Sequence, residues 1–255
     1  MSIDLVGKAA LVTGASGGIG RAIASKLADA GAMVALNYLN SREAAEEAVV
    51  AIRAQGGTAV AIQADVARAE EAARLVEEAA AAFGRPVDLL INNAGQLIQR
   101  LPNEEMTEEL YGQVMDVNLK SAVFVAKAAI PGMKAAGGGS IVNMTSVAAH
   151  NGGGPGASIY AASKAAVLAY TKGLAKELAA SGIRVNAISP GFIGQTAFHA
   201  AFTPVAAREA TIQSIPMRRE GTPEDVAGIA LFLVSGLSAY LTGETIEVNG
   251  GMYMR

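Results

Sequence analysis

Residues 9–20 read AALVTGASGGIG, and the rest of the chain is best interpreted outward from them. The apolar run at residues 9–13 predicts a buried strand, and the glycines after it predict a tight turn that opens a helix. Glycine lets the backbone approach a pyrophosphate, and the following helix directs its first amide groups at that negative charge. Because the turn lies between the first strand and the first helix, it favours a dinucleotide site over an ordinary connection.

Short apolar runs and longer helical patterns alternate along the rest of the chain. We expect strands at residues 9–13, 33–37, 59–63, 87–92, 140–145, 184–189 and 245–248. We expect helices at residues 19–30, 42–55, 70–83, 108–136, 159–181 and 223–235. This order predicts an α/β fold with a doubly wound parallel sheet. No linker or second domain interrupts it, so we expect a single domain over residues 1–255.

Composition narrows the possible functions. The chain has 255 residues, no cysteine and two histidines without an acidic cluster, so we expect no disulfide, no cysteine nucleophile and no metal site. A net charge of −3 gives no reason to expect nucleic-acid binding. No segment has the length and apolarity of a membrane span, and the N-terminus lacks a signal-peptide pattern. We therefore expect a cytoplasmic protein.

A second group of residues carries acid–base chemistry. Tyr160 and Lys164 share one face of an expected helix, and Ser146 precedes the tyrosine by fourteen positions. A nearby ammonium favours the phenolate and lowers a phenol pKa from its usual value of about 10. A Tyr-x-x-x-Lys pair alone is more often a surface pair. Together with the glycine turn and a hydroxyl at Ser146, the pair indicates proton transfer at a carbon–oxygen bond beside a nucleotide hydride carrier. Thr145, the neighbour of Ser146, is the competing candidate for this hydroxyl.

Several motifs in the same order resemble those of the short-chain dehydrogenase/reductase family. Residues 13–20 resemble T-G-x-x-x-G-x-G, residues 92–95 read NNAG, residues 160–164 fit Y-x-x-x-K, and residues 190–191 read PG. The resemblance spans essentially the whole chain. It implies a Rossmann-type sheet of about seven parallel strands with helices on both faces.

The resemblance also implies a catalytic set of Asn118, Ser146, Tyr160 and Lys164. Tyr160 would be the general acid in reduction and the general base in oxidation. Lys164 would lower the pKa of Tyr160 and bind the nicotinamide ribose, and Ser146 would orient the substrate oxygen. Asn118 would support a water that relays protons from Lys164 to solvent.

The cofactor contacts that the resemblance implies start at the glycine turn. They comprise Gly14, Ser16, Gly17, Gly18, Ile19, Gly20, Asn92, Ala94, Gly95, Tyr160, Lys164, Pro190, Gly191, Ile193 and Thr196. Asp65 and Val66 match the position beside the adenine, although Asp65 is almost as good a candidate for a helix N-cap.

The end of the second expected strand bears on the choice between NAD and NADP. An acidic residue there would hold the ribose 2′-hydroxyl of NAD and repel a 2′-phosphate, but none appears before Glu43. The polar side chains at this position, all able to donate to a phosphate, are Asn37, Asn40, Ser41 and Arg42. We therefore expect NADP(H) to be favoured over NAD(H), although Asn40 or Ser41 can instead cap the next helix with Arg42 solvated.

The expected function is that of an NADP(H)-dependent oxidoreductase for a small carbonyl or alcohol substrate. We expect residues 191–216 to form a lid over the substrate site. The chain resembles the branch of 3-oxoacyl-carrier-protein reductases and bacterial sugar or polyol dehydrogenases. We expect a 3-oxoacyl reductase-like or general carbonyl reductase. A sugar or polyol dehydrogenase is the alternative, and a non-catalytic dinucleotide-binding redox sensor is the alternative of another class. The family also implies a homotetramer built on the two long helices.

Overall fold

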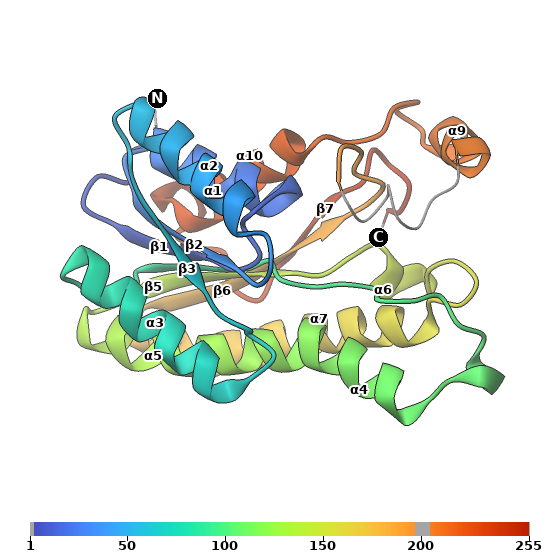
Figure 1. Ribbon diagram of the computed structural model, residues 1–255, viewed down its shortest axis with the longest axis horizontal. Coiled ribbons are helices and arrows are strands. Elements are labelled where there is room, and N and C mark those ends of the chain that lie inside the picture. The colour runs from blue at the N-terminus through green and yellow to red at the C-terminus, as the bar shows by residue number, and fades with distance from the viewer. Residues whose placement is uncertain (1–2, 197–204, 255) are drawn as a thin grey trace.

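The computed structural model describes residues 3–196 and 205–254, which contain a sheet of seven parallel strands (Figure 1). The strands are β1 (Ala9–Val12), β2 (Met33–Tyr38), β3 (Thr58–Gln63), β4 (Leu89–Asn92), β5 (Gly139–Met144), β6 (Ile183–Pro190) and β7 (Thr245–Val248). Their order is β3-β2-β1-β4-β5-β6-β7, with every pair parallel. The predicted Rossmann-type sheet is confirmed, and its strand order reverses between β1 and β4.

Helices cover both faces of the sheet (Figure 1). One face carries α1 (Gly18–Asp29), α2 (Arg42–Ala54) and α10 (Pro223–Val234). The other carries α3 (Ala69–Phe83), α5 (Ser121–Ala135) and α7 (Ser158–Leu178). Except at the start of α5, each bound lies close to the one expected from the sequence, because apolar periodicity and the glycines after the helices mark these segments locally.

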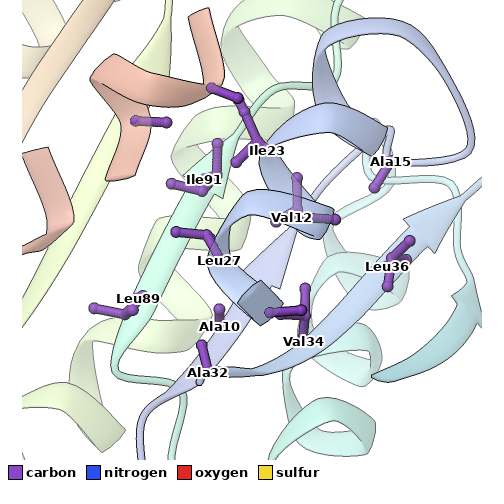
Figure 2. Packing of buried hydrophobic residues seen from close by; sticks show 14 of the residues in the cluster. Ala10, Val12, Ala15, Ile23, Leu27, Ala32, Val34, Leu36, Leu89 and Ile91 are labelled. Atoms are coloured by element: carbon purple, nitrogen blue, oxygen red, sulfur yellow. The ribbon is translucent and has the colours of Figure 1, made fainter. Parts of the chain in front are cut away.

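The two core clusters follow from the alternation of side chains along the strands. Val12 of β1 packs in the cluster under α1, whereas its neighbour Leu11 packs under α3. Figure 2 shows Ile23 and Leu27 of α1 directed at the strands. Both side chains are fully buried. Burial of their apolar area therefore holds α1, the helix that follows the glycine turn, against the sheet.

The expected helix at residues 108–136 is not continuous. It is divided into α4 (Glu108–Met115), a π-helical turn η2 (Asp116–Lys120) and α5. The side-chain amide of Asn118 donates to the carbonyl of Val114, which is the acceptor that the backbone N–H of residue 118 would use in an α-helix. Wide turns of this kind are common at functional sites.

Several short elements were not expected from the sequence. These are α6 (Ala148–Asn151), α9 (Val205–Ser214) and the 3-10 turns η1 (Asn103–Glu105), η3 (Ala179–Ser181) and η4 (Gly236–Ser238). The C-terminal tail ends close to α6 (Figure 1), where Tyr253 stacks on His150. Within the described residues, no helix combines the length and apolarity needed to cross a membrane.

Candidate active site

A cavity of about 570 Å³ opens at the carboxyl ends of the central strands. It lies where the strand order reverses, which is the usual ligand site of an open α/β sheet. The predicted residues that line it are Gly14, Ser16, Gly17, Gly18, Ile19, Gly20, Gly95, Ser146, Tyr160, Lys164, Pro190, Gly191, Ile193 and Thr196. The structure therefore brings the glycine turn and the Ser–Tyr–Lys set into one cavity.

The glycine turn is packed tightly on one side and open on the other. A Cβ at Gly20 would lie 2.5 Å from the carbonyl oxygen of Gly14 and 2.6 Å from Nδ2 of Asn93. The same Asn93 amide donates to the carbonyls of Thr13 and Gly14, which holds the turn against β4. A Cβ at Gly17 would meet nothing within 4 Å. A rigid turn with one open face at the start of a helix fits a dinucleotide pyrophosphate.

The expectation that Asn37 donates to a cofactor phosphate is wrong. Its side chain is 2% exposed and its oxygen accepts the backbone N–H of Gly14 at 3.1 Å. Its amide nitrogen donates to the carbonyls of Tyr38, Ile62 and Ala64. Because both N–H groups are used within the protein, Asn37 positions the glycine turn and has no donor left for a phosphate.

The other predicted residues at the end of β2 are exposed and lie outside the lining of the cavity. Ser41 is the N-cap residue of α2, but its side chain makes no capping hydrogen bond. Nε of Arg42 lies 3.9 Å from a carboxylate oxygen of Glu46, with both side chains largely exposed. Asn40, Ser41 and Arg42 thus remain accessible to a group that extends along β2.

Asp65 and Val66 also lie outside the cavity lining. The helix N-cap role that competed for Asp65 is wrong, because the N-cap residue of α3 is Arg68. Asp65 instead accepts the backbone N–H of Ala67 at 3.0 Å and closes a turn. Val66 is buried in the core under α3.

Asn92 is part of a buried polar chain. Its amide donates to Oδ1 of Asn143 at 2.9 Å, and the Asn143 amide donates to Oγ1 of Thr171 on α7 at 2.9 Å. This chain joins β4, β5 and α7, so Asn92 acts on the site by positioning α7. Ala94 packs against the core, and its backbone N–H donates to Oγ1 of Thr13.

Tyr160 and Lys164 lie one turn apart on α7, as predicted, and Ser146 lies two residues after the end of β5. Nζ of Lys164 donates to the carbonyl of Met144 at 3.0 Å and lies 5.9 Å from the centre of the Tyr160 ring. The hydroxyl of Thr145 donates to the carbonyl of Lys164, at 2.9 Å. Because Thr145 is engaged with α7, Ser146 is the better candidate for contact with a substrate oxygen.

Burial governs the protonation of both α7 groups. It raises the pKa of Tyr160, and the side-chain hydrogen bond with Ser146 offsets this only in part. The neighbouring lysine was expected to lower the pKa of Tyr160, so the observed direction is opposite to the expected one. Burial also lowers the pKa of Lys164 to about 8. At neutral pH the tyrosine is therefore a neutral phenol on the same helix as a lysine that still carries its charge.

Asn118 lies behind Gly95 at the back of the cavity. A Cβ at Gly95 would lie 2.6 Å from Oδ1 of Asn118 and 2.7 Å from Nζ of Lys164. Oδ1 of Asn118 also accepts the backbone N–H of Gln96, and its amide donates to the Gln96 carbonyl at 2.8 Å. The π-helical turn thus places Asn118 next to the lysine amine and ties it to the loop after β4.

Further residues line the cavity beside the predicted ones. They come from the loop after Gly95, the segment before α7, the predicted lid and the C-terminal tail, and include Leu97, Arg100, Asn151, Gly153, Gly154, Ala157, Phe192, Thr211 and Met252. No local signal marked Arg100 or Met252. Of the predicted lid, His199, Phe198 and Phe202 lie outside the described residues.

His150 lies in α6 and does not line the cavity. Its Nε2 lies 3.0 Å from a carboxylate oxygen of Glu247, and its ring stacks on Tyr253 with 4.7 Å between centroids. The glycine-rich segment before α7 is also tied down, since Arg100 donates to the carbonyl of Pro155 and Leu101 donates to that of Gly156.

A glycine turn at the switch point of a parallel sheet, with Ser146, Tyr160 and Lys164 in the same cavity, is the arrangement expected of a dinucleotide-dependent enzyme. Comparison with known proteins leads to the same class. A family model described as enoyl-(acyl carrier protein) reductase matches residues 14–253. A 3-oxoacyl-[acyl-carrier-protein] reductase of Staphylococcus epidermidis is 42% identical over 251 residues, 97% of this chain and 99% of that protein.

Two solved structures are similar over nearly their full length. A putative short-chain alcohol dehydrogenase from Sinorhizobium meliloti has 42% identity and a TM-score of 0.93, over 99% of this chain and 98% of that one. A putative NAD(P)-dependent gluconate 5-dehydrogenase from Beutenbergia cavernae with bound NADP has 39% identity and a TM-score of 0.91, over 99% of each chain. The chain belongs to the short-chain dehydrogenase/reductase family and is an oxidoreductase that interconverts alcohols and carbonyls with NAD(P).

Proposed function

We propose that the protein is an NADP(H)-dependent reductase of ketones, with Tyr160 as the general acid. The observation that carries this proposal is the hydrogen-bonded Ser146–Tyr160 pair, which opens on the same cavity as the glycine turn. A bound nicotinamide supplies the hydride. Tyr160 gives its proton to the substrate oxygen and Ser146 donates a hydrogen bond to that oxygen. The Lys164 ammonium stabilises the phenolate that is left behind.

The raised pKa of Tyr160 favours this direction of reaction. A neutral phenol donates a proton to a developing alkoxide, whereas oxidation of an alcohol requires the phenolate as a base. We propose that Asn118 supports the return of a proton to Tyr160 through Lys164, since its side chain lies beside the same glycine as the lysine amine. Both reactions share one site, and the balance between them depends on pH.

The test of the acid role is the variant Tyr160→Phe. It removes the hydroxyl but keeps the ring, so NADPH binding, followed by the fluorescence of the nicotinamide, is expected to survive. NADPH oxidation with a ketone is expected to fall by about 10²- to 10⁴-fold, the usual contribution of a general acid. Tyr170→Phe is the matched control on the same helix. Retention of most activity in Tyr160→Phe would sink the assignment.

We infer that NADP(H) is preferred to NAD(H). The exposed side chains of Asn40, Ser41 and Arg42 follow β2 without an acidic residue among them, and a related structure contains NADP. Arg42→Ala is expected to lower kcat/KM for NADPH while leaving that for NADH nearly unchanged. Equal or higher rates with NADH than with NADPH, at equal sub-saturating concentrations, would contradict the preference.

The proposed substrate is a 3-oxoacyl thioester or another small ketone. The relative from Staphylococcus epidermidis is named for the first of these reactions. A sugar or polyol dehydrogenase is the alternative, favoured by the gluconate dehydrogenase relative. An NADPH-coupled screen of β-ketoacyl thioesters, diketones, aldoses and polyols separates them. A non-catalytic sensor would bind NADPH but turn over none of these compounds.

We further propose a single domain with a lid at residues 191–216, working in the cytoplasm as a homotetramer. Phe192 and Thr211 line the cavity from this segment, which supports the lid. Half-buried apolar side chains such as Val123 on α5 and Leu168 on α7 support pairing of these helices between subunits. Light scattering that gives the monomer mass would contradict the tetramer.

A further inference from the structure

Arg100 is a cationic side chain on the lining of the cavity, far along the chain from the catalytic helix. The ionisable side chains among the described lining residues are Arg100, Tyr160 and Lys164, and no carboxylate is among them. Lys164 is buried and engaged with the Met144 carbonyl. Arg100 is exposed, and in the described part of the chain it forms no ion pair, although Glu104 follows closely.

The loop before α7 orients this arginine. Nη1 of Arg100 donates to the carbonyl of Pro155 at 3.0 Å, and the backbone N–H of Leu101 donates to the carbonyl of Gly156 at 3.0 Å. Gly156 has a φ of +71°, and a Cβ there would lie 2.8 Å from the Leu101 nitrogen. Only glycine fits this approach, so the loop and Arg100 are packed as one unit directly before Tyr160.

Within the described residues the guanidinium donates through Nη1 to Pro155, which leaves the Nε and Nη2 donors for another acceptor. A planar fork of this kind matches a carboxylate or a phosphate with two parallel hydrogen bonds. The guanidinium also lies on the lining of the cavity, where an anionic group of a substrate can reach it. We propose that Arg100 binds an anionic group of the substrate, a carboxylate or a phosphate, other than the carbonyl that is reduced. This inference rests on the proposed reductase function.

The test compares anionic and neutral forms of one ketone. Acetoacetate is paired with ethyl acetoacetate, which lacks the carboxylate. Acetoacetyl-coenzyme A is paired with the acetoacetyl thioester of N-acetylcysteamine, which lacks the phosphates. We compare kcat/KM in the wild type, Arg100→Gln, Arg100→Lys and Lys26→Gln. The last variant removes one exposed positive charge on α1 that does not line the cavity.

Arg100→Gln is expected to lower kcat/KM for the anionic member of one pair by about tenfold or more, because it removes a charge-assisted hydrogen bond. The neutral partner is expected to change by less than about twofold, Arg100→Lys to recover part of the loss, and Lys26→Gln to behave as wild type. A loss confined to acetoacetate identifies the bound group as a carboxylate, and a loss confined to acetoacetyl-coenzyme A identifies it as a phosphate. Equal losses for charged and neutral members, or no loss, would overturn the proposal, because a loop anchor affects both alike.

A binding measurement separates this inference from the proposed function. Calorimetry measures the affinity of acetoacetate and of acetoacetyl-coenzyme A for the protein saturated with NADP⁺, where no reduction takes place. If no compound is reduced, the proposed function fails. A loss of affinity for an anion in Arg100→Gln but not in Lys26→Gln then still supports the anion site. Unchanged affinity in Arg100→Gln, or no binding of either anion, overturns it.

Discussion

Gly95 packs closely against both Lys164 and Asn118, and substitution with alanine tests whether this packing controls catalysis. The added Cβ would lie 2.7 Å from Nζ of Lys164, so the amine has to move by about 0.7 Å to regain the 3.4 Å of ordinary contact. Oδ1 of Asn118, at 2.6 Å, has to move by about 0.8 Å. Both groups are held by hydrogen bonds to backbone atoms, Lys164 to Met144 and Asn118 to Gln96, so neither can move freely.

A misplacement of about 1 Å at a catalytic group can cost about a hundredfold in rate. Gly95→Ala is therefore expected to lower kcat/KM for NADPH-linked ketone reduction by about tenfold to a hundredfold. Overpacking is expected to lower the free energy of unfolding by about 1–3 kcal/mol. The assays are steady-state NADPH oxidation and urea unfolding followed by circular dichroism.

Gly228→Ala is the matched control for this variant. Gly228 lies within α10, and a Cβ there would meet nothing within 4 Å, so alanine is expected to preserve activity and stability. If Gly95→Ala kept more than half of the wild-type kcat/KM with an unchanged urea midpoint, the proposed link between this packing and the reaction would be refuted.

Three further results are expected. The rate of reduction should fall above about pH 8, where Lys164 loses the proton that helps stabilise the Tyr160 phenolate, whereas a flat kcat/KM profile up to about pH 9.5 would speak against this role. Asn37→Ala should lower activity with NADPH and NADH alike, and lower the free energy of unfolding in urea by about 1–3 kcal/mol, because it releases the glycine turn. A loss of activity confined to NADPH would instead support a role of Asn37 at the cofactor phosphate. Thr222→Ala should cost about 1 kcal/mol of unfolding free energy, because the Thr222 and Asp225 side chains cap α10 reciprocally, whereas Thr222→Ser should cost little.

The sheet and the glycine turn could be predicted from the sequence because their signals are local. Continuous apolar runs identify strands covered on both faces, and a glycine after a helix marks its end. The tyrosine and lysine share a helix face by spacing alone. These features are enough to place the turn and α7 at the same edge of the sheet, and the structure agrees on each of them.

The parts that sequence could not predict depend on contacts between distant residues. The role of Asn37 depends on the carbonyls of Ile62 and Ala64, which only the pairing of β2 with β3 brings within reach. The π-helical turn depends on Asn118 meeting Gln96, twenty-two positions earlier. Arg100 enters the cavity because the glycine-rich loop before α7 packs on it. Periodicity carries no information about such pairs.

Lys164 and Asn118 show why these distant contacts matter for the chemistry. A buried lysine with its pKa lowered to about 8 is sensitive to any change in its surroundings. A Cβ at Gly95 would lie 2.7 Å from the Lys164 amine and 2.6 Å from the Asn118 oxygen, so both groups need a glycine there. The π-helical turn moves Asn118 to this place, and the bonds to Gln96 keep it there. The interruption of a long helix therefore fixes Asn118 close to the lysine amine, where the relay that we propose would need it.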